Sequence, residues 1–346
     1  MEQVEIRDNI EYVYLPTALE FINALSPWSP RFVDKKPKSW IFRGQSKKSW
    51  PLVPSALRSK ESLMNVLPQE CQTNKEQIDA EFKSLLTFFD IADISAISLP
   101  EDSQRLRVAL ENLKKKIVVG TYYNELKAGK VQWPPLEFLS IAGLAQHYGL
   151  PTRLLDWTYD SYVAAYFAAS CVVKASHEGQ SKKRLIEEYC RRKGYEYDER
   201  TAKISIYGYD RTLAVWAYNL SIDVTVRHDT SNKPPYRIVH VPYATNPNIS
   251  AQKGLFTILI NPTLDGDKEV DRTSFDHALV EYFGTSKYPP DKIAFMTCFC
   301  THHDQAFEIL RLLAGMGVTA GTIFPGIAGA SATVSERLWW WEKNDS

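Results

Sequence analysis

The segment from Leu144 to Ala169, LAQHYGLPTRLLDWTYDSYVAAYFAA, constrains the fold more than any other part of the chain. Gly149 and Pro151 break its first helix, because glycine permits positive φ and proline disfavours the α region in the residue before it. Residues 152–158 are then predicted to form a short strand. The helix that follows carries apolar residues at helical spacing with small alanines between them. A helix, a charged strand and a core helix therefore meet at one place.

The short strand carries two opposite charges, Arg153 and Asp156. An isolated buried charge costs several kcal/mol, so neither side chain is expected to stay unpaired. The two residues lie three apart on a strand and therefore point to opposite faces, where they serve different partners. If Asp156 belongs to a buried network, its replacement by alanine should cost about 3 kcal/mol.

Composition excludes several classes of protein. The chain has 346 residues, of which 44% are hydrophobic, enough for a large core. Lys+Arg 41 balance Asp+Glu 41, so no global field recruits nucleic acid or an anionic membrane. Five scattered cysteines favour a reducing compartment. With neither a signal-peptide pattern nor a membrane-length apolar run, we expect a soluble cytoplasmic protein.

The remaining pattern predicts an α+β fold, with a mixed or antiparallel sheet and flanking helices. We expect one domain over residues 1–346, with a helical insertion at about 59–130 and a charged, solvated excursion at about 181–203. Helices are predicted at residues 17–25, 275–283 and 304–314. Strands are predicted at residues 4–14, 40–45, 204–209, 213–218, 224–226, 236–241, 255–260, 292–300 and 318–324.

Three residues of this pattern have both a functional and a structural interpretation. Arg43 ends a predicted strand, where functional side chains commonly project, but it could instead pair with Asp156 in the core. His147 lies near a helix end, and a structural hydrogen bond competes there with a general-base role. Trp157 fits the core better than a stacking platform.

Other motifs point to no cofactor chemistry. Cys298, Cys300, His302 and His303 could share a face of one strand, but their spacing matches no zinc pattern, so we expect no metal site. The glycines form neither a phosphate loop nor a dinucleotide-binding fingerprint. This pattern disfavours ATPases and dehydrogenases.

Four motifs in order resemble the FRG domain family, which is named for the tripeptide found here at residues 42–44. The motifs are Ile41-Phe-Arg-Gly-Gln45, the segment from Gln146 to Thr158, Ser250-Ala-Gln-Lys-Gly-Leu-Phe-Thr257 and Thr322-Ile-Phe-Pro-Gly326. Where the family often carries an arginine before the third motif, this chain has Asn246-Pro-Asn248. The resemblance implies no settled biochemical activity.

A more distant resemblance links the chain to ADP-ribosyltransferases of the arginine-serine-glutamate type. Phe42-Arg43-Gly44 is similar to their first motif, and Leu155-Asp-Trp-Thr158 with the following alanine-rich helix is similar to the second. Ser250-Ala-Gln252 takes the third place, with glutamine where the family has its catalytic acid. The resemblance implies that the arginine grips the NAD diphosphate and that the threonine holds the nicotinamide ribose. The glutamine can hydrogen-bond but supplies no negative charge.

These observations predict a polar cleft that binds NAD or another nucleotide. The cleft-lining candidates are Arg43, His147, Arg153, Asp156 and Thr158. ADP-ribosyl transfer or NAD cleavage would be the catalytic version, with Arg43, His147, Thr158 and Gln252 as catalytic residues. NAD would then be a substrate, and no cofactor is required.

Two alternatives remain open. The chain could be a recognition module that binds a protein partner through exposed aromatics such as those near Trp339. Nucleic acid is a less favoured partner, through Lys47, Lys48 and Arg58 or the basic residues between Lys182 and Lys193, because the net charge is zero. A concave site at which Arg43, Asp156, Thr158 and Gln252 converge would favour the ligand hypothesis over both.

Overall fold

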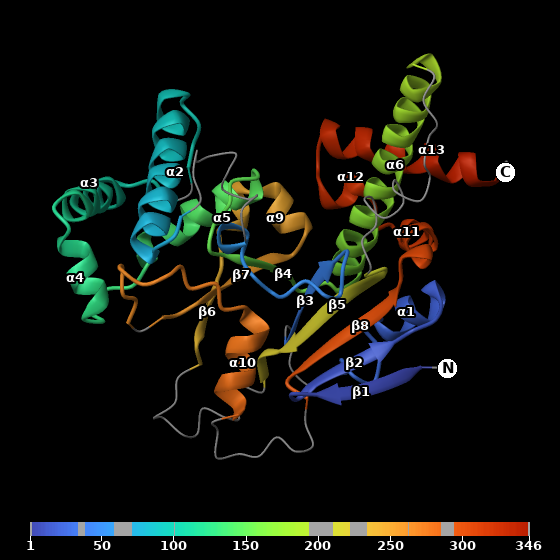
Figure 1. The fold of residues 1–346 in the computed structure, drawn as a ribbon, viewed down its shortest axis with the longest axis horizontal. Coiled ribbons are helices and arrows are strands. Elements are labelled where there is room, and N and C mark those ends of the chain that lie inside the picture. The colour runs from blue at the N-terminus through green and yellow to red at the C-terminus, as the bar shows by residue number, and fades with distance from the viewer. Residues whose placement is uncertain are drawn as a thin grey trace.

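The structure, a computed structural model, describes residues 2–33, 39–58, 71–99, 101–193, 210–221, 234–261, 263–284 and 294–344. Its described strands form one sheet in the order β1-β2-β8-β5-β3-β4-β7-β6 (Figure 1). Strands β2 and β8 run parallel, and the other neighbouring pairs in this sheet are antiparallel. A mixed sheet flanked by helices confirms the predicted α+β fold. The strands are β1 (Gln3–Arg7), β2 (Ile10–Tyr14), β3 (Trp40–Gln45), β4 (Leu155–Thr158), β5 (Thr212–Asn219), β6 (Tyr236–Val239), β7 (Gly254–Leu259) and β8 (Met296–His302).

The helices lie on both faces of the sheet and beside it, and α2, α3 and α4 stand together at the end away from β1 (Figure 1). None of the helices in the described ranges is long and apolar enough to span a bilayer. The helices are α1 (Ala18–Ala24), α2 (Asn74–Ile94), α3 (Gln104–Val118), α4 (Thr121–Lys127), α5 (Leu139–His147), α6 (Ser161–Lys193), α9 (Pro247–Ala251), α10 (Phe275–Gly284), α11 (Ala306–Gly315), α12 (Ala320–Ile323) and α13 (Ile327–Asn344).

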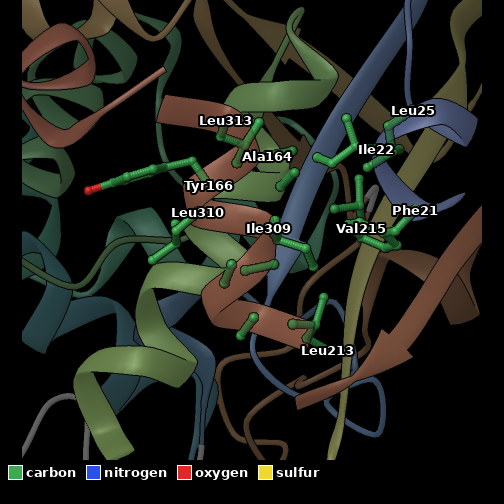
Figure 2. Close-up of a cluster of buried hydrophobic side chains, with 14 of the residues drawn as sticks. Phe21, Ile22, Leu25, Ala164, Tyr166, Leu213, Val215, Ile309, Leu310 and Leu313 are labelled. Carbon is green, nitrogen blue, oxygen red and sulfur yellow. The ribbon is translucent and has the colours of Figure 1, made fainter. Parts of the chain in front are cut away.

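Strand β5 shows how the sheet separates two cores. Leu213 and Val215 pack in the cluster formed with α1, α6 and α11, which Figure 2 shows in close-up. Trp216 and Tyr218 point to the opposite face and pack with residues of α10. This alternation follows from the two-residue period of a strand, and burial of each large side chain contributes about 2 kcal/mol.

Local sequence signals fix the starts of two helices that position the site. Helix α2 begins with a capping box in which the Thr73 side chain accepts from the Glu76 amide and the Glu76 carboxylate accepts from the Thr73 amide. Helix α6 begins after Asp160, whose Oδ1 accepts from the amides of Tyr162 at 3.0 Å and Val163 at 3.4 Å. Asp160 is thus the N-cap of α6.

Several predicted elements are confirmed with shifted ends, and three differ. Residues 4–14 form a hairpin, β1 and β2, because Asp8 and Asn9 take positive φ of 51° and 58°. The strand predicted at 152–158 begins only at Leu155, since the Thr152 amide donates to the Ser55 hydroxyl instead of a neighbouring strand. The strand predicted at 318–324 is wrong, because Thr319 caps the short helix α12 there.

The regions predicted as an insertion and as a charged excursion are helical where the structure describes them. The residues predicted as a helical insertion, 59–130, contain α2, α3 and α4, which pack their apolar faces into one cluster with α5. The charged excursion predicted at 181–203 is a continuation of α6 as far as Lys193. Its remainder, and the strands predicted at 204–209 and 224–226, lie outside the described residues.

At Gly44 the main chain of β3 lies directly against the main chain of α6. A Cβ built at Gly44 would lie 2.0 Å from the Ala164 carbonyl oxygen and 2.8 Å from the Ala168 amide nitrogen. Both atoms belong to the helix backbone and cannot move aside as a flexible side chain could. Glycine is therefore required at this position by close packing of a strand on a helix.

We expect Gly44→Ala to lower the free energy of unfolding by about 3 kcal/mol or to prevent folding, because the added methyl group overpacks a backbone contact. Gly315→Ala is the matched control, since a Cβ at this helical glycine meets nothing within 4 Å. Urea unfolding of both variants measures the effect. Equal stability of Gly44→Ala and wild type would show that β3 and α6 do not approach as described.

Candidate functional site

A cleft opens where β3 and β4 part. The two strands are paired only at Phe42 and Thr158. Beyond this pair Arg43 on β3 and Asp156 on β4 line a cavity of about 320 Å³. The other walls come from the end of α5, the first turns of α6, the segment that enters β7, and Phe324 after α12.

Arg43 bridges the gap between the parted strands. Its Nη1 donates to the Asp156 carbonyl oxygen at 2.9 Å and lies 3.3 Å from the Asp156 carboxylate Oδ2. The side chain is only 10% exposed. Its Nε is buried and has no hydrogen-bond partner among the described residues. The Arg43 Nη1 thus supplies the donor that β3 no longer offers to the Asp156 carbonyl. The Nε of the same guanidinium is left without an acceptor in the described part of the chain.

Asp156 is held in place by side chains from α5 and the loop before β4. Its Oδ1 accepts from the side-chain Nε2 of Gln146, and the side-chain Oε1 of Gln146 in turn accepts from the Thr152 hydroxyl. The Asp156 side chain is nevertheless 57% exposed. This network fixes the orientation of an open carboxylate at the cleft.

Thr158 and Gln252 meet at the cleft, but both are engaged in local structure. The Thr158 hydroxyl donates to the Gln252 carbonyl at 2.6 Å and accepts from the Asp160 amide at 2.9 Å. The Gln252 side-chain Nε2 donates to the Ile323 carbonyl at 3.3 Å. The Thr158 hydroxyl therefore joins β4 to the entrance of β7, and a ligand would have to displace one of these bonds to use it.

His147 lines the cleft at the end of α5, as predicted. Its burial lowers the pKa of the imidazole below the ordinary 6.5, and the negative charge of Asp156 opposes this shift. His147 is therefore neutral at pH 7. A neutral imidazole can accept or donate one hydrogen bond to a ligand.

Arg153 does not line the cleft, in contrast to the placement predicted from the sequence. Its Nε donates to both carboxylate oxygens of Glu81, at 2.9 and 2.8 Å. Trp133 and Gln77 complete the network with bonds of 2.6 and 2.7 Å to the same carboxylate. Arg153 and Asp156 do serve different partners, as strand geometry requires, but the buried acid is Glu81 and not Asp156.

The sequence analysis did not identify Glu81 as the partner of Arg153, although the position of Glu81 on its helix indicates burial. Glu81 lies among the buried positions Ile78, Phe82 and Phe89 of α2, and it is itself only 4% exposed. A charged residue at helical spacing within an apolar face requires a buried partner. Its distance from Arg153 along the chain hides which partner that is.

Aromatic side chains form the apolar walls of the cleft. Trp157 is 3% exposed, and its Nε1 donates to Thr257 at 2.9 Å, so it is a core residue as predicted. Phe167 and Phe324 pack edge to face with ring centroids 5.9 Å apart, and both line the cleft. Neither was identified as a site residue from the sequence.

The cysteine and histidine residues of β8 lie outside the cleft. Cys298 and Cys300 are fully buried with their Sγ atoms 3.5 Å apart, and the His303 Nε2 lies 2.6 Å from the Ser46 carbonyl. Within the described ranges, no three His, Cys, Asp or Glu side chains gather as metal ligands.

We expect the two acidic residues to differ in their contribution to stability. Glu81→Ala leaves the buried Arg153 guanidinium unpaired and should cost about 4 kcal/mol. Asp156→Ala should cost about 1 kcal/mol or less, because this carboxylate is exposed and Arg43 keeps its bond to the main chain. Urea unfolding compares the two variants. A larger loss for Asp156→Ala would contradict these assignments.

Part of this cleft lies in a region of the chain that matches a known family model. Residues 38–178 match the family model described as the FRG domain. The match contains the tripeptide at residues 42–44 and the segment from Gln146 to Thr158. The later motifs, at residues 250–257 and 322–326, lie outside it, although each contributes a residue to the cleft. No curated protein and no solved structure matches the chain. The chain therefore contains an FRG domain, matched over residues 38–178.

Proposed function

We propose that the cleft binds a nucleotide-type ligand, with NAD as the first candidate, and that Arg43 takes one of its phosphate groups. The observation that carries this proposal is the buried Nε of Arg43, which has no acceptor among the described residues at the wall of an open cleft. A guanidinium donates to phosphate through paired N–H groups in a fixed fork. An anionic ligand would supply the acceptor that this nitrogen lacks.

The charges around Asp156 also favour an anion. Arg43 is within ion-pair distance of Asp156. Desolvation, and then the positive charge of Arg43, lower the pKa of the Arg58 guanidinium, while Asp156 opposes this shift. Two guanidinium groups therefore interact with one carboxylate. The side chain of Arg43, which lines the cleft itself, supplies the positive charge that favours a phosphate at this position.

The size and walls of the cleft fit one end of a nucleotide. A cavity of about 320 Å³ is at the lower end of the range for small-molecule sites. Phe167 and Phe324 offer an apolar surface to a flat ring, and Gln252 lies at the same wall. The cleft thus combines a cationic fork with an aromatic wall.

NAD cleavage or ADP-ribosyl transfer is the catalytic version of this proposal, and it would depend on Asp156. Among the described residues that line the cleft, Asp156 is the only carboxylate. Gln252 stands where the transferase pattern has its acid and supplies no negative charge. Asp156 could stabilise the cationic ribose that forms when the bond to nicotinamide breaks. His147, Thr158 and Gln252 would position the ligand through hydrogen bonds.

We expect Arg43→Lys to weaken NAD binding by about tenfold or more, because lysine keeps the charge but loses the planar fork. The thermal midpoint should stay within about 3 °C of wild type. Titration calorimetry with NAD measures the affinity. Arg311→Lys is the matched control, since Arg311 makes an exposed pair with Glu308 on α11.

A wild-type protein that gives no heat with NAD or with other nucleotides would overturn the proposal and leave the recognition module as the better hypothesis. Incubation with labelled NAD tests the catalytic version separately. We expect any nicotinamide release to fall by about a hundredfold in Asp156→Asn, a typical effect for one electrostatic group. Release that is unchanged in this variant would exclude Asp156 from the chemistry.

We expect NAD affinity to rise about threefold as the pH falls from about 7.5 to about 5.5. His147 is neutral at the upper pH because its pKa is below 6.5, and a bound phosphate raises that pKa. Binding of a phosphate therefore favours the protonated form of His147, increasingly so as the pH falls. The same lowered pKa means that the unfolded state binds more protons, so His147 decreases stability as the pH falls through this window.

The affinity of His147→Gln should not change with pH in this window. Calorimetry at a temperature well below unfolding separates the binding effect from the loss of stability. An equal pH dependence in wild type and variant would show that His147 does not face the ligand.

A further inference from the structure

The C-terminal helix α13 contacts the short helix α12 through one face. This face consists of Gly329, Thr333 and Glu336, which are spaced as neighbours on a helix surface. A Cβ at Gly329 would lie 1.9 Å from the Phe324 carbonyl oxygen, so the two segments are in main-chain contact. The Thr333 hydroxyl accepts from the Gly321 amide at 2.7 Å. Helix α13 thus holds α12 at both of its ends.

Glu336 makes the buried contact of this face. It is 6% exposed, and its carboxylate accepts from the Tyr166 hydroxyl and from the Ala320 amide, the latter at 3.4 Å. Burial raises the pKa of Glu336, while both hydrogen bonds oppose that shift. Tyr166 belongs to α6 and precedes Phe167 of the cleft wall. Glu336 therefore links α13 to α6 and to the start of α12.

Polar contacts, and not apolar burial, hold this helix face. Between residues 327 and 338 the buried positions are Gly329 and Glu336. The larger apolar residues of the same stretch are exposed, with Ile327 91%, Val334 57% and Leu338 49% accessible. Residues 327–338 of this helix therefore gain little from the hydrophobic effect. Within this stretch, the hydrogen bonds of Glu336 and Thr333 attach the helix to α6 and α12.

The other end of α12 reaches the cleft. The Ile323 carbonyl accepts from the Gln252 side chain at 3.3 Å. The next residue, Phe324, lines the cleft and packs against Phe167. The four residues of α12 therefore connect Glu336 at one end with the aromatic wall at the other.

We propose that Glu336 is a positioning residue for the cleft, which sets Phe324 as the wall for the ring of the bound nucleotide. This inference rests on the proposed nucleotide binding. Glu336 does not line the cleft and acts through α12. Loss of its two hydrogen bonds frees the start of α12 and lets Phe324 leave the ring-binding position.

The test is a double-mutant cycle on NAD affinity, measured by titration calorimetry below the unfolding transition of every variant. Glu336→Ala and Phe324→Ala should each raise the dissociation constant by about tenfold. In the Phe324→Ala background, Glu336→Ala should have no further effect, because the group it positions is already gone. A merely structural role would give additive effects.

Two further variants on α13 keep the test valid if Glu336→Ala folds poorly. Thr333→Val removes the acceptor of the Gly321 amide with little change in shape, and should raise the dissociation constant by about threefold only while Phe324 is present. Ser335→Ala is the control, because Ser335 is exposed and its hydroxyl donates only to Ser331 of the same helix.

The outcomes separate this inference from the function on which it rests. Wild type that does not bind NAD overturns both. Wild type that binds NAD, with additive effects of Glu336→Ala and Phe324→Ala or with no effect of either, overturns the positioning role alone. Tenfold effects that do not add, together with wild-type affinity in Ser335→Ala, support it.

Discussion

The main-chain contact between β3 and α6 at Gly44 is the constraint on which the rest of the site depends. With 2.0 Å between a Cβ at Gly44 and the Ala164 carbonyl oxygen, no side chain fits, so the strand is fixed on the helix. The residues before it then have defined directions. Phe42 enters the core cluster beneath α6, and Arg43 points into the gap between β3 and β4. A different contact therefore accounts for each residue of the Phe-Arg-Gly tripeptide: core packing for Phe42, the gap between the strands for Arg43, and the backbone of α6 for Gly44.

Arg43 connects the architecture with the proposed chemistry. Its Nη1 satisfies the Asp156 carbonyl oxygen, which has lost its place in a regular strand pair, and this contact keeps the guanidinium at the cleft. A buried N–H without an acceptor costs about 1–3 kcal/mol, more for a charged group. The free protein carries this cost at Nε, and an anionic ligand would remove it. The structural and the ligand-binding interpretations of Arg43 are therefore compatible, since different atoms of the same side chain serve each.

Much of the fold follows from local signals that a single sequence contains. Strand β5 has a two-residue period, Gly149 has a φ of +92° where the helix was predicted to break, and the helix over 275–283 ends at Gly284. The helix at 320–323 was missed, because Thr319 forms a cap in a run of apolar residues that otherwise resembles a strand. The Thr319 amide donates to the Thr322 hydroxyl at 2.9 Å, and a helix starts there although the apolar residues favoured a strand.

The site was less predictable because it depends on pairings across the chain. The motifs predict that Arg43, His147, Asp156, Thr158 and Gln252 come together, and the cleft contains all five. Arg153 was misplaced because its partner Glu81 lies on helix α2, far away along the chain, and no local pattern reveals that contact. The short helix that presents Phe324 likewise depends on Glu336 of α13, a contact that a sequence does not show.

A crystal structure of the protein with NAD tests the central claim most directly, because it shows the acceptor of the Arg43 Nε. We expect a phosphate oxygen at about 2.9 Å from this nitrogen, with one ring of the ligand against Phe324. A complex in which NAD lies elsewhere, with the Arg43 Nε still unpaired, would contradict the assignment of the cleft as a nucleotide site.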